Sequence, residues 1–152
     1  TNYGISHDII KAVLNDLEEN IPNIFRKADF IFSIKEKNNF KELVTAYNRI
    51  DSIVENFSDK IIINPEKFIE KQEQNLYNVY LEVSNTIEDL NKNEYGNIYK
   101  ELIKLIDPVH NLFENVRVMA EDSSVKSNRM SLLSRILEKM KLLGDLSKIE
   151  IK

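Results

Sequence analysis

Two histidines, His7 and His110, are the side chains of this sequence best suited to proton transfer or metal binding near neutral pH. Neither lies in an E-x-x-H or H-E-x-x-H motif, which would place two ligands on one helical face. The sequence has no cysteine, no glycine-rich phosphate loop and no G-x-S-x-G nucleophile motif. We therefore expect no catalytic residue, no metal and no cofactor in this chain, and we interpret it as a binding module.

The side chains best suited to binding are hydrogen-bond donors of the kind that contact phosphates and bases. Arginine and lysine bind phosphate oxygens, and arginine and asparagine also form paired hydrogen bonds with base edges. The candidate binding residues of this type are Asn48, Arg49, Lys126, Asn128, Arg129 and Arg135. The first two fall in a segment predicted to be helical, and the other four fall in the last predicted helix.

Two amphipathic helices are expected to position the four candidate residues of the last predicted helix. The first is predicted to begin after Asp107 as N-cap, because the following apolar residues recur at helical spacing: Val109, Leu112, Phe113 and Val116. The second is predicted to end near Gly144 and has a longer apolar face: Leu132, Leu133, Ile136, Leu137, Met140 and Leu143. Both faces are expected to be buried, with the basic residues of the last helix on its other side.

A polar elbow containing Asn115, Glu121 and Asp122 joins these two helices. Its simplest role is structural. Glu121 and Asp122 precede the last helix, where they can cap its N-terminus, favour its dipole, or pair with Arg129. Asn115 can bond to the backbone of the elbow itself. We therefore place these three residues apart from the candidate binding set.

Helical spacing of apolar residues continues through the rest of the chain, and we predict an all-α bundle of about seven helices. The most regular pattern runs from Phe40 to Phe57, after Asn39 as an expected cap. This helix and the one from Ser124 to Leu143 are predicted to be core elements. Residues 58–64 are β-branched in part, but no partner strand is evident, so we interpret them as a connector.

Length and charge limit the possible classes of protein. A chain of 152 residues fits one domain, and no run of about 20 apolar residues predicts a membrane span, so we expect a soluble, cytoplasmic protein. The net charge of −4 does not favour a general nucleic-acid binder. Residues 108–152 carry eight basic and six acidic side chains, and they form the one basic third. Composition alone favours a solvated face there.

The sequence NVRVMAED at 115–122, followed by SNRMSLL at 127–133, resembles the C-terminal signature of the beta subunit of bacterial two-subunit glycyl-tRNA synthetases. That family has approximately N-V-M-V-M-A-E-D and then N-R-L-x-L-L. GISHDIIKAVL at 4–14 and YNRIDSI at 47–53 are similar to other segments of the family. The sequence departs from it at Arg117, where an apolar residue is usual, and at Asn48, where lysine is usual.

The resemblance implies a helical anticodon-binding domain of the type found at the C-terminus of arginyl-tRNA synthetases. Residues 1–152 would form this single domain, as the C-terminal part of a longer beta subunit. The implied partners are glycine tRNA and the alpha subunit, where ATP and glycine are expected to bind, so that this chain alone would not be catalytic. The implied role of the six candidate residues is to bind the tRNA.

Glycine anticodons end in two cytosines, and unstacked bases of this kind are recognised on their exposed edges. A cytosine offers an amino donor beside two acceptors, so its recognition needs an acceptor near an arginine or asparagine. Glu121, Asn128 and Arg129 are close enough in sequence to supply both groups.

Two other classes remain open. A helical protein-interaction module without nucleic-acid binding would be favoured by an exposed apolar patch on the aromatic-rich segment 24–34. A carboxylate-rich bundle enzyme would require inward-pointing acidic residues together with histidine, a pattern that the sequence lacks.

Overall fold

The computed structural model describes residues 5–14, 21–58 and 61–151. All regular secondary structure in these residues is helical, as the apolar spacing predicts. The α-helices are α1 (His7–Leu14), α2 (Ile21–Ile34), α3 (Asn38–Val54), α4 (Lys71–Glu88), α5 (Tyr95–Leu102), α6 (Ile106–Asn115) and α7 (Ser123–Met140). Short 3-10 turns are η2 (Pro65–Lys67), η3 (Ile103–Leu105), η4 (Lys141–Leu143) and η5 (Leu146–Lys148). Among the described helices, none is both long and apolar enough to cross a membrane.

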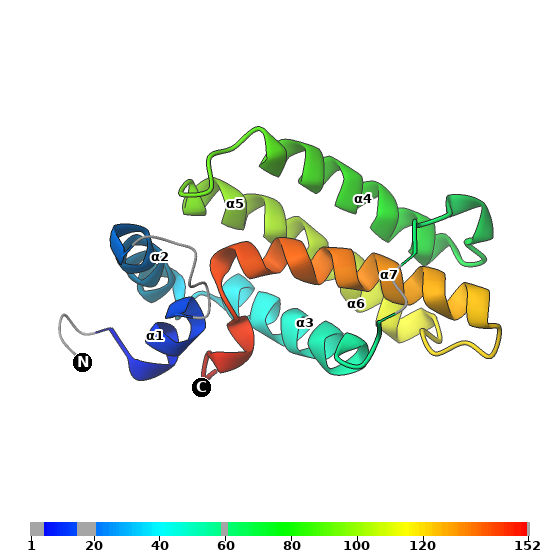
Figure 1. Ribbon diagram of the computed structural model, residues 1–152, viewed down its shortest axis with the longest axis horizontal. Coiled ribbons are helices and arrows are strands. Elements are labelled where there is room, and N and C mark those ends of the chain that lie inside the picture. Colours follow the sequence, from blue (N-terminus) through cyan, green and yellow to red (C-terminus); the bar gives the residue numbers. More distant parts are fainter. Residues whose placement is uncertain (1–4, 15–20, 59–60, 152) are drawn as a thin grey trace.

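Helix α7 lies at the centre of the molecule. In Figure 1 it runs between α4 and α3, and it packs against both. Its buried residues include the polar side chains of Asn128, Arg129, Ser131 and Ser134 in addition to the apolar ones. The sequence predicts a last helix with one buried face and one basic exposed face, whereas the structure encloses most of its circumference.

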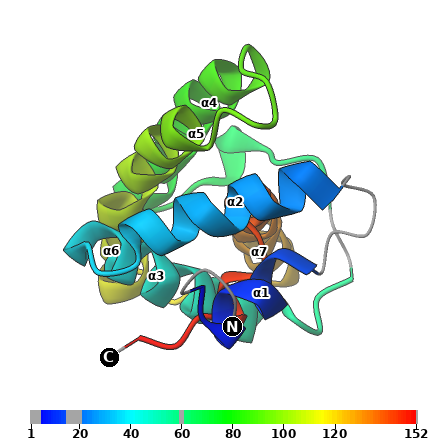
Figure 2. The ribbon, with the colours of Figure 1, turned by 90° about the vertical axis from the view of Figure 1, so that its left-hand side faces the viewer.

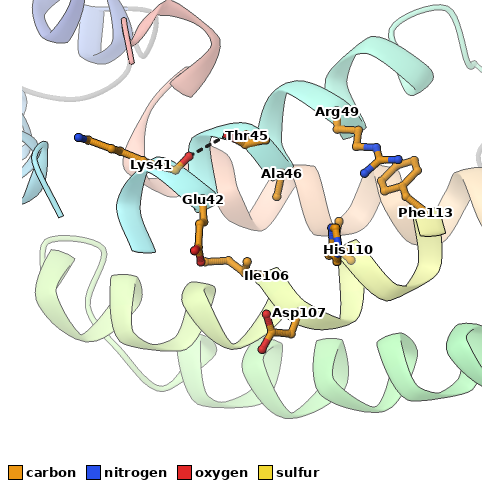
Figure 3. Close-up of a pocket in the computed structure, with 10 residues that line it drawn as sticks. Lys41, Glu42, Thr45, Ala46, Arg49, Ile106, Asp107, His110 and Phe113 are labelled. Atoms are coloured by element: carbon orange, nitrogen blue, oxygen red, sulfur yellow. Dashed lines mark hydrogen bonds between the residues drawn. The ribbon is translucent and has the colours of Figure 1, made fainter. Parts of the chain in front are cut away.

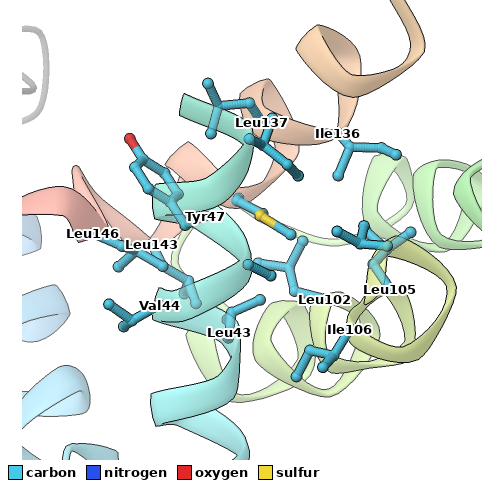
Figure 4. Packing of buried hydrophobic residues seen from close by; sticks show 14 of the residues in the cluster. Leu43, Val44, Tyr47, Leu102, Leu105, Ile106, Ile136, Leu137, Leu143 and Leu146 are labelled. Atoms are coloured by element: carbon cyan, nitrogen blue, oxygen red, sulfur yellow. The ribbon is translucent and has the colours of Figure 1, made fainter. Parts of the chain in front are cut away.

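The main hydrophobic core lies between α3, α7 and the segment formed by α5, η3 and α6. Figure 4 shows Leu43 of α3 next to Leu102, with Leu105 and, from α7, Ile136 on one side of this pair and Tyr47 of α3 on the other. All five side chains are 0 or 1% exposed. The prediction that α3 and α7 are core elements is therefore confirmed, because the helical repeat of apolar residues marks the faces on which these helices meet.

Helices α5 and α6 are joined by η3 without a loop, so that Tyr95–Asn115 is one continuous helical segment. Counted in this way, the described residues contain six separate α-helical segments, slightly fewer than the predicted seven. Asp107 lies inside α6, and no side chain caps the start of this helix. The expected N-cap role of Asp107 is therefore wrong, because the chain is already helical when it enters α6.

Helices α1 and α2 form a separate pair at one end of the bundle, where α2 crosses in front of α7 in the end-on view of Figure 2. The C-terminal turn packs onto this end. Gly144 adopts a φ of 113°, and a Cβ at this position would lie 2.9 Å from the carbonyl oxygen of Ala12. The next residue, Asp145, donates its backbone N–H to the same oxygen at 2.9 Å. Only glycine satisfies both the backbone conformation and this close approach.

Asp8 connects three parts of this end of the molecule. Its carboxylate accepts a hydrogen bond from Lys35, just after α2, at 2.7 Å and one from the backbone N–H of Glu150 at 2.8 Å. Burial alone would raise the pKa of Asp8, but the hydrogen bonds from Lys35, Ser6 and Glu150 outweigh it and hold the pKa well below its usual range. Asp8 therefore ties α1 to both α2 and the C-terminal tail.

Candidate nucleic-acid interface

A groove of about 380 Å³ lies between α3 and α6. Helix α3 contributes residues spaced along one of its faces: Lys41, Glu42, Thr45, Ala46 and Arg49. Helix α6 contributes the opposite wall: Ile106, Asp107, Val109, His110 and Phe113. Figure 3 shows these side chains and the two helices that carry them. The volume falls within the roughly 300–1,000 Å³ typical of small-ligand sites.

Arg49 and Phe113 form one end of this groove. The guanidinium carbon of Arg49 lies 4.5 Å from the centroid of the Phe113 ring, in a cation–π contact between α3 and α6 (Figure 3). Arg49 is exposed, so that its donors remain open to solvent on the groove side. Asn48 is also exposed, one position before it on α3. The ring thus supports the guanidinium without burying it.

The opposite end of the groove is acidic. Glu42 extends from α3 toward Ile106, and Asp107 lies near the start of α6 (Figure 3). Both carboxylates are exposed. Lys41 points away from the groove centre, and its Nζ lies 3.7 Å from a carboxylate oxygen of Glu36. The groove therefore presents a cation at one end and carboxylates at the other.

The floor between these two ends is apolar. Ala46, Ile106 and Val109 are 8, 9 and 1% exposed, respectively. His110 projects into the middle of the groove and is exposed. A planar ligand in the groove would thus lie on aliphatic side chains and have polar groups at both of its ends.

Asn128 occupies a different environment on α7. Its side chain is 0% exposed, and it forms a pair of hydrogen bonds with the backbone of Asn64. The Oδ1 atom accepts from the Asn64 N–H at 2.8 Å, and the Nδ2 atom donates to the Asn64 carbonyl at 3.0 Å. These bonds use the two groups with which asparagine would contact a base, so Asn128 holds the connector after α3 in place.

Arg129 is likewise buried, at 5% exposed, and its guanidinium is engaged on two sides. The Nε and Nη2 atoms donate to the two carboxylate oxygens of Glu73 on α4, at 2.6 and 3.4 Å. The Nη1 atom donates to the carbonyl oxygen of Arg117 in the elbow at 2.6 Å. Arg129 therefore connects α7, α4 and the elbow.

The Glu73 carboxylate that pairs with Arg129 has further hydrogen-bond partners. Its Oε2 atom also accepts the backbone N–H groups of Ile69 and Glu70 at 2.8 Å each, at the start of α4. Burial alone would raise the pKa of Glu73, but the hydrogen bonds from Arg129, Glu70 and Ile69 outweigh it and lower the pKa. The Glu73 carboxylate is therefore ionised, hydrogen-bonded and paired, as a buried charge must be.

Arg135 and Lys126 are the remaining candidates on α7, and both are half-buried. Arg135 donates to the carbonyl oxygen of Ile61 at 3.3 Å, and the Ile61 N–H donates to Ser131 at 3.0 Å. Residues 61–64 therefore lie along α7 and cover its polar side, held by Asn128, Ser131 and Arg135.

Of the structural roles predicted for the three elbow residues, the structure shows that of Asp122 and differs for Glu121 and Asn115. Asp122 is the N-cap of α7, and it accepts the N–H groups of Ser124 and Val125 at 2.9 and 3.2 Å. Glu121 is exposed, and the carboxylate that pairs with Arg129 is that of Glu73 instead. Asn115 donates to the carbonyl of Asn111 within α6 at 2.9 Å rather than to the elbow.

The six candidate residues thus have different surroundings. Arg49 lines the α3–α6 groove, and Asn48 is exposed one position before it on α3. Asn128 and Arg129 are buried against the connector and α4, and Lys126 and Arg135 are half-buried on α7. The expected cluster of Glu121, Asn128 and Arg129 around a cytosine does not form an open site. From the sequence, Phe113 is assigned only to a buried face, and neither Glu42 nor His110 is among the candidate binding residues. The spacing of Glu42, Ala46 and Arg49 by four and three indicates a shared face, but it does not show that α6 lies opposite.

The described residues form an all-helical domain with a groove between α3 and α6. The sequence profile of the DALR anticodon binding domain matches residues 43–151, and the chain belongs to this family. The matched region extends from α3 to the C-terminal tail and includes most of the groove. The resemblance based on residues 115–122 and 127–133 is therefore confirmed.

Similar proteins also match the chain over most of its length. It is 33% identical over 151 residues to the glycine–tRNA ligase beta subunit of Clostridioides difficile. The aligned region covers 98% of this chain and 22% of that protein. It is 31% identical over 131 residues to the glycine–tRNA ligase beta subunit of Halalkalibacterium halodurans, covering 86% of this chain and 19% of that protein. The chain thus spans about a fifth of the length of these relatives.

Proposed function

We propose that this chain is the tRNA-binding module of a glycine–tRNA ligase beta subunit, and that it binds the anticodon loop of glycine tRNA to support attachment of glycine. Membership of the anticodon-binding family supports the nucleic-acid class, and the names of the similar proteins support the choice of tRNA. In this proposal residues 1–152 form one domain of a longer beta subunit.

The observation that carries the proposal is the exposed Arg49 guanidinium supported on Phe113 at the edge of the α3–α6 groove. Anticodon bases are unstacked, and such bases bind to arginine and aromatic planes and to polar groups beside them. Arg49 is the candidate residue that lines this groove, and the exposed Asn48 precedes it on α3. Lys126 and Arg135 are proposed to contact backbone phosphates, whereas Asn128 and Arg129 are assigned to holding the fold.

Binding measurements with two tRNA transcripts test this function. Fluorescence anisotropy at one stated salt concentration would compare glycine tRNA with a version whose three anticodon bases are changed. We expect this chain to bind the altered tRNA at least about tenfold more weakly, since each lost base contact costs about 1–3 kcal/mol. Equal affinity for both tRNAs, or no binding of either, would contradict the proposal.

The chemistry of glycine attachment is proposed to lie elsewhere. ATP and glycine would bind the alpha subunit, which this chain would reach through the rest of the beta subunit, in the cytoplasm where translation occurs. Purified alone, the chain should not exchange pyrophosphate into ATP in the presence of glycine. Glycine-dependent exchange above the buffer background would contradict this division of labour.

A second function is favoured by the apolar surface of α1 and α2. A groove of about 370 Å³ there is lined almost entirely by aliphatic and aromatic residues. Ile21 and Phe25 in it are 68 and 56% exposed, and Phe32, also on α2, is 50% exposed. Exposed apolar surface of this kind is typical of protein contacts, and it lies outside the residues 43–151 that match the family.

We therefore also propose that α1 and α2 contact another part of the beta subunit, in addition to tRNA binding by the α3–α6 side. The remaining four-fifths or so of the similar proteins would supply that surface. Phe25→Ser should weaken association with a separately expressed remainder of the Clostridioides difficile subunit without changing tRNA affinity. Unchanged association of a folded Phe25→Ser chain would contradict this second function.

A further inference from the structure

We propose that the α3–α6 groove receives one unstacked base that carries an exocyclic amine, namely an anticodon cytosine, with Glu42 accepting from the amine and Arg49 donating to the ring acceptors. This inference rests on the proposed function and names the ligand chemistry of its site. It also assigns recognition to Glu42 and Phe113, which were outside the candidate binding residues.

The charges of the groove favour a base over a phosphate. Arg49 at one end is opposed by the carboxylates of Glu42 and Asp107, and Lys41 is turned toward Glu36. Phosphate binding requires an excess of positive charge, and the carboxylates would repel the anion. A neutral base carries no net charge and contacts donors and acceptors at once. The backbone phosphates would thus remain outside the groove.

Apolar contact provides the main surface for the base. The guanidinium carbon of Arg49 lies 4.5 Å from the centroid of the Phe113 ring, and this contact leaves the N–H donors at the guanidinium edge for the acceptors of a base in the groove. The buried side chains of Ala46, Ile106 and Val109 form an apolar floor for the ring. This part of the site selects a base without selecting which base.

Glu42 is the residue that distinguishes cytosine from uracil in this proposal. It is seven residues before Arg49, or roughly 10 Å along α3. A base edge with a hydrogen bond of about 2.9 Å at each of its ends has a length similar to this helical rise. Cytosine places its amine at one end of that edge and acceptors beyond it, whereas uracil places a carbonyl where the amine would be. A uracil carbonyl would therefore face the Glu42 carboxylate, acceptor against acceptor, and binding would weaken.

The experiment combines variants of this chain with variants of glycine tRNA. Fluorescence anisotropy would measure the affinity of each chain for the natural transcript and for two transcripts with one anticodon cytosine replaced by uracil. The variants are Glu42→Gln, Phe113→Leu and Arg49→Gln. Matched controls are Glu82→Gln on α4 and Arg26→Gln on α2, both exposed and away from the groove.

We expect the wild-type chain to discriminate against uracil at one cytosine position by about tenfold or more, and Glu42→Gln to reduce that ratio to near one. Phe113→Leu should weaken binding of all three transcripts severalfold, because it removes the ring support. The two controls should leave both affinity and discrimination unchanged. Thermal unfolding curves would confirm that each variant is folded.

Three results would overturn the inference. Preserved discrimination in a folded Glu42→Gln chain would place cytosine recognition elsewhere. An equal loss for all transcripts in Arg49→Gln, with a salt dependence reduced by about one phosphate contact, would make Arg49 a phosphate ligand. A wild-type chain that binds all anticodon variants equally would instead refute the proposed function itself, and this outcome is distinct from the other two.

Discussion

Helices α3 and α7 each carry an asparagine followed by an arginine, and the two pairs have opposite environments. Asn48 and Arg49 on α3 are exposed beside a groove, whereas Asn128 and Arg129 on α7 are 0 and 5% exposed. The four side chains have the same donors and the same apparent suitability for nucleic acid. Their surroundings decide the role, because the Arg129 guanidinium is buried and already bonds to Glu73 and a backbone carbonyl, whereas that of Arg49 is exposed.

The comparison shows that an amphipathic pattern defines what one helical face must contact but leaves the opposite face undetermined. On α3 the polar side remains open to solvent and to α6. On α7 it is covered by residues 61–64 and by the start of α4. A polar helix face can thus be as fully enclosed as an apolar one, provided that each polar group is hydrogen-bonded.

The strongest test of this difference is the replacement of Arg129 by methionine. The change leaves Glu73 buried without its partner, and we expect a loss of about 3–5 kcal/mol in the free energy of unfolding. Urea denaturation of the purified chain measures it. Adding Glu73→Gln, which removes the charge but keeps an oxygen for the α4 backbone, should recover part of the loss. A cost below about 1 kcal/mol would show that the ion pair is not important for stability.

The apolar side of α7 provides the next largest effect. Ile136→Ala or Leu133→Ala should destabilise the chain by roughly 2–5 kcal/mol, since each truncation leaves a cavity in the core. Both side chains are fully buried. The same denaturation experiment provides the measurement, and losses below about 1 kcal/mol at both positions would mean that the assigned face of α7 is wrong.

The two asparagines offer a matched pair of smaller changes. Asn128→Ala should cost about 1–3 kcal/mol, because it leaves the half-buried backbone N–H and carbonyl of Asn64 without their partners. Asn48→Ala, at an exposed position, should change stability by no more than about 0.5 kcal/mol. If the two variants lost similar unfolding free energy in parallel denaturation experiments, the proposed difference between the asparagines of α3 and α7 would be wrong.

Acid should weaken the α7 network through Glu73. The folded-state pKa of Glu73 is lowered from its ordinary value of 4.5. Its contribution to stability is therefore present above that value and is lost as the pH falls below it toward the folded-state pKa. Unfolding free energy measured from pH 6 downward should fall less steeply in the Arg129→Met, Glu73→Gln chain. Identical slopes for this chain and the wild type would exclude Glu73 as a source of the pH dependence.

Some of this arrangement could be predicted from the sequence because the signals are local. The cap by Asp122 involves residues two and three positions later, and the apolar repeat of α7 lies within one helix. The Arg129–Glu73 pair joins residues 56 positions apart, and the Asn128–Asn64 bonds span 64 positions. No local pattern specifies either pairing. The buried Ser131 and Ser134 offered a clue, since small residues on the polar side allow another segment to approach closely.

The groove between α3 and α6 could not be predicted from the sequence either, because it also depends on residues far apart in the chain. The spacing of residues on α3 and on α6 defines each wall separately, but the contact of Arg49 with Phe113 depends on how the two helices pack. An aromatic residue at a helical apolar position is assigned to the core by its type alone. Phe113 is instead half-buried, with its ring facing an arginine at the surface.

Arg49→Ala should change stability only slightly, and it separates the two helices most clearly. Its cation–π contact is exposed and contributes about 0.5–1 kcal/mol at most, so the melting curve should shift little. Its affinity for glycine tRNA should nevertheless fall by about tenfold, because Arg49 is proposed to donate to the acceptors of the base. Arg26→Ala, an exposed arginine on α2, should change neither quantity. Arg129→Met gives the opposite pattern, with a large loss of stability and a loss of tRNA binding only in proportion to the unfolded fraction. If Arg49→Ala left tRNA affinity unchanged in a folded chain, Arg49 would be excluded from the site, and the α1–α2 surface would become the better candidate for the function of this domain.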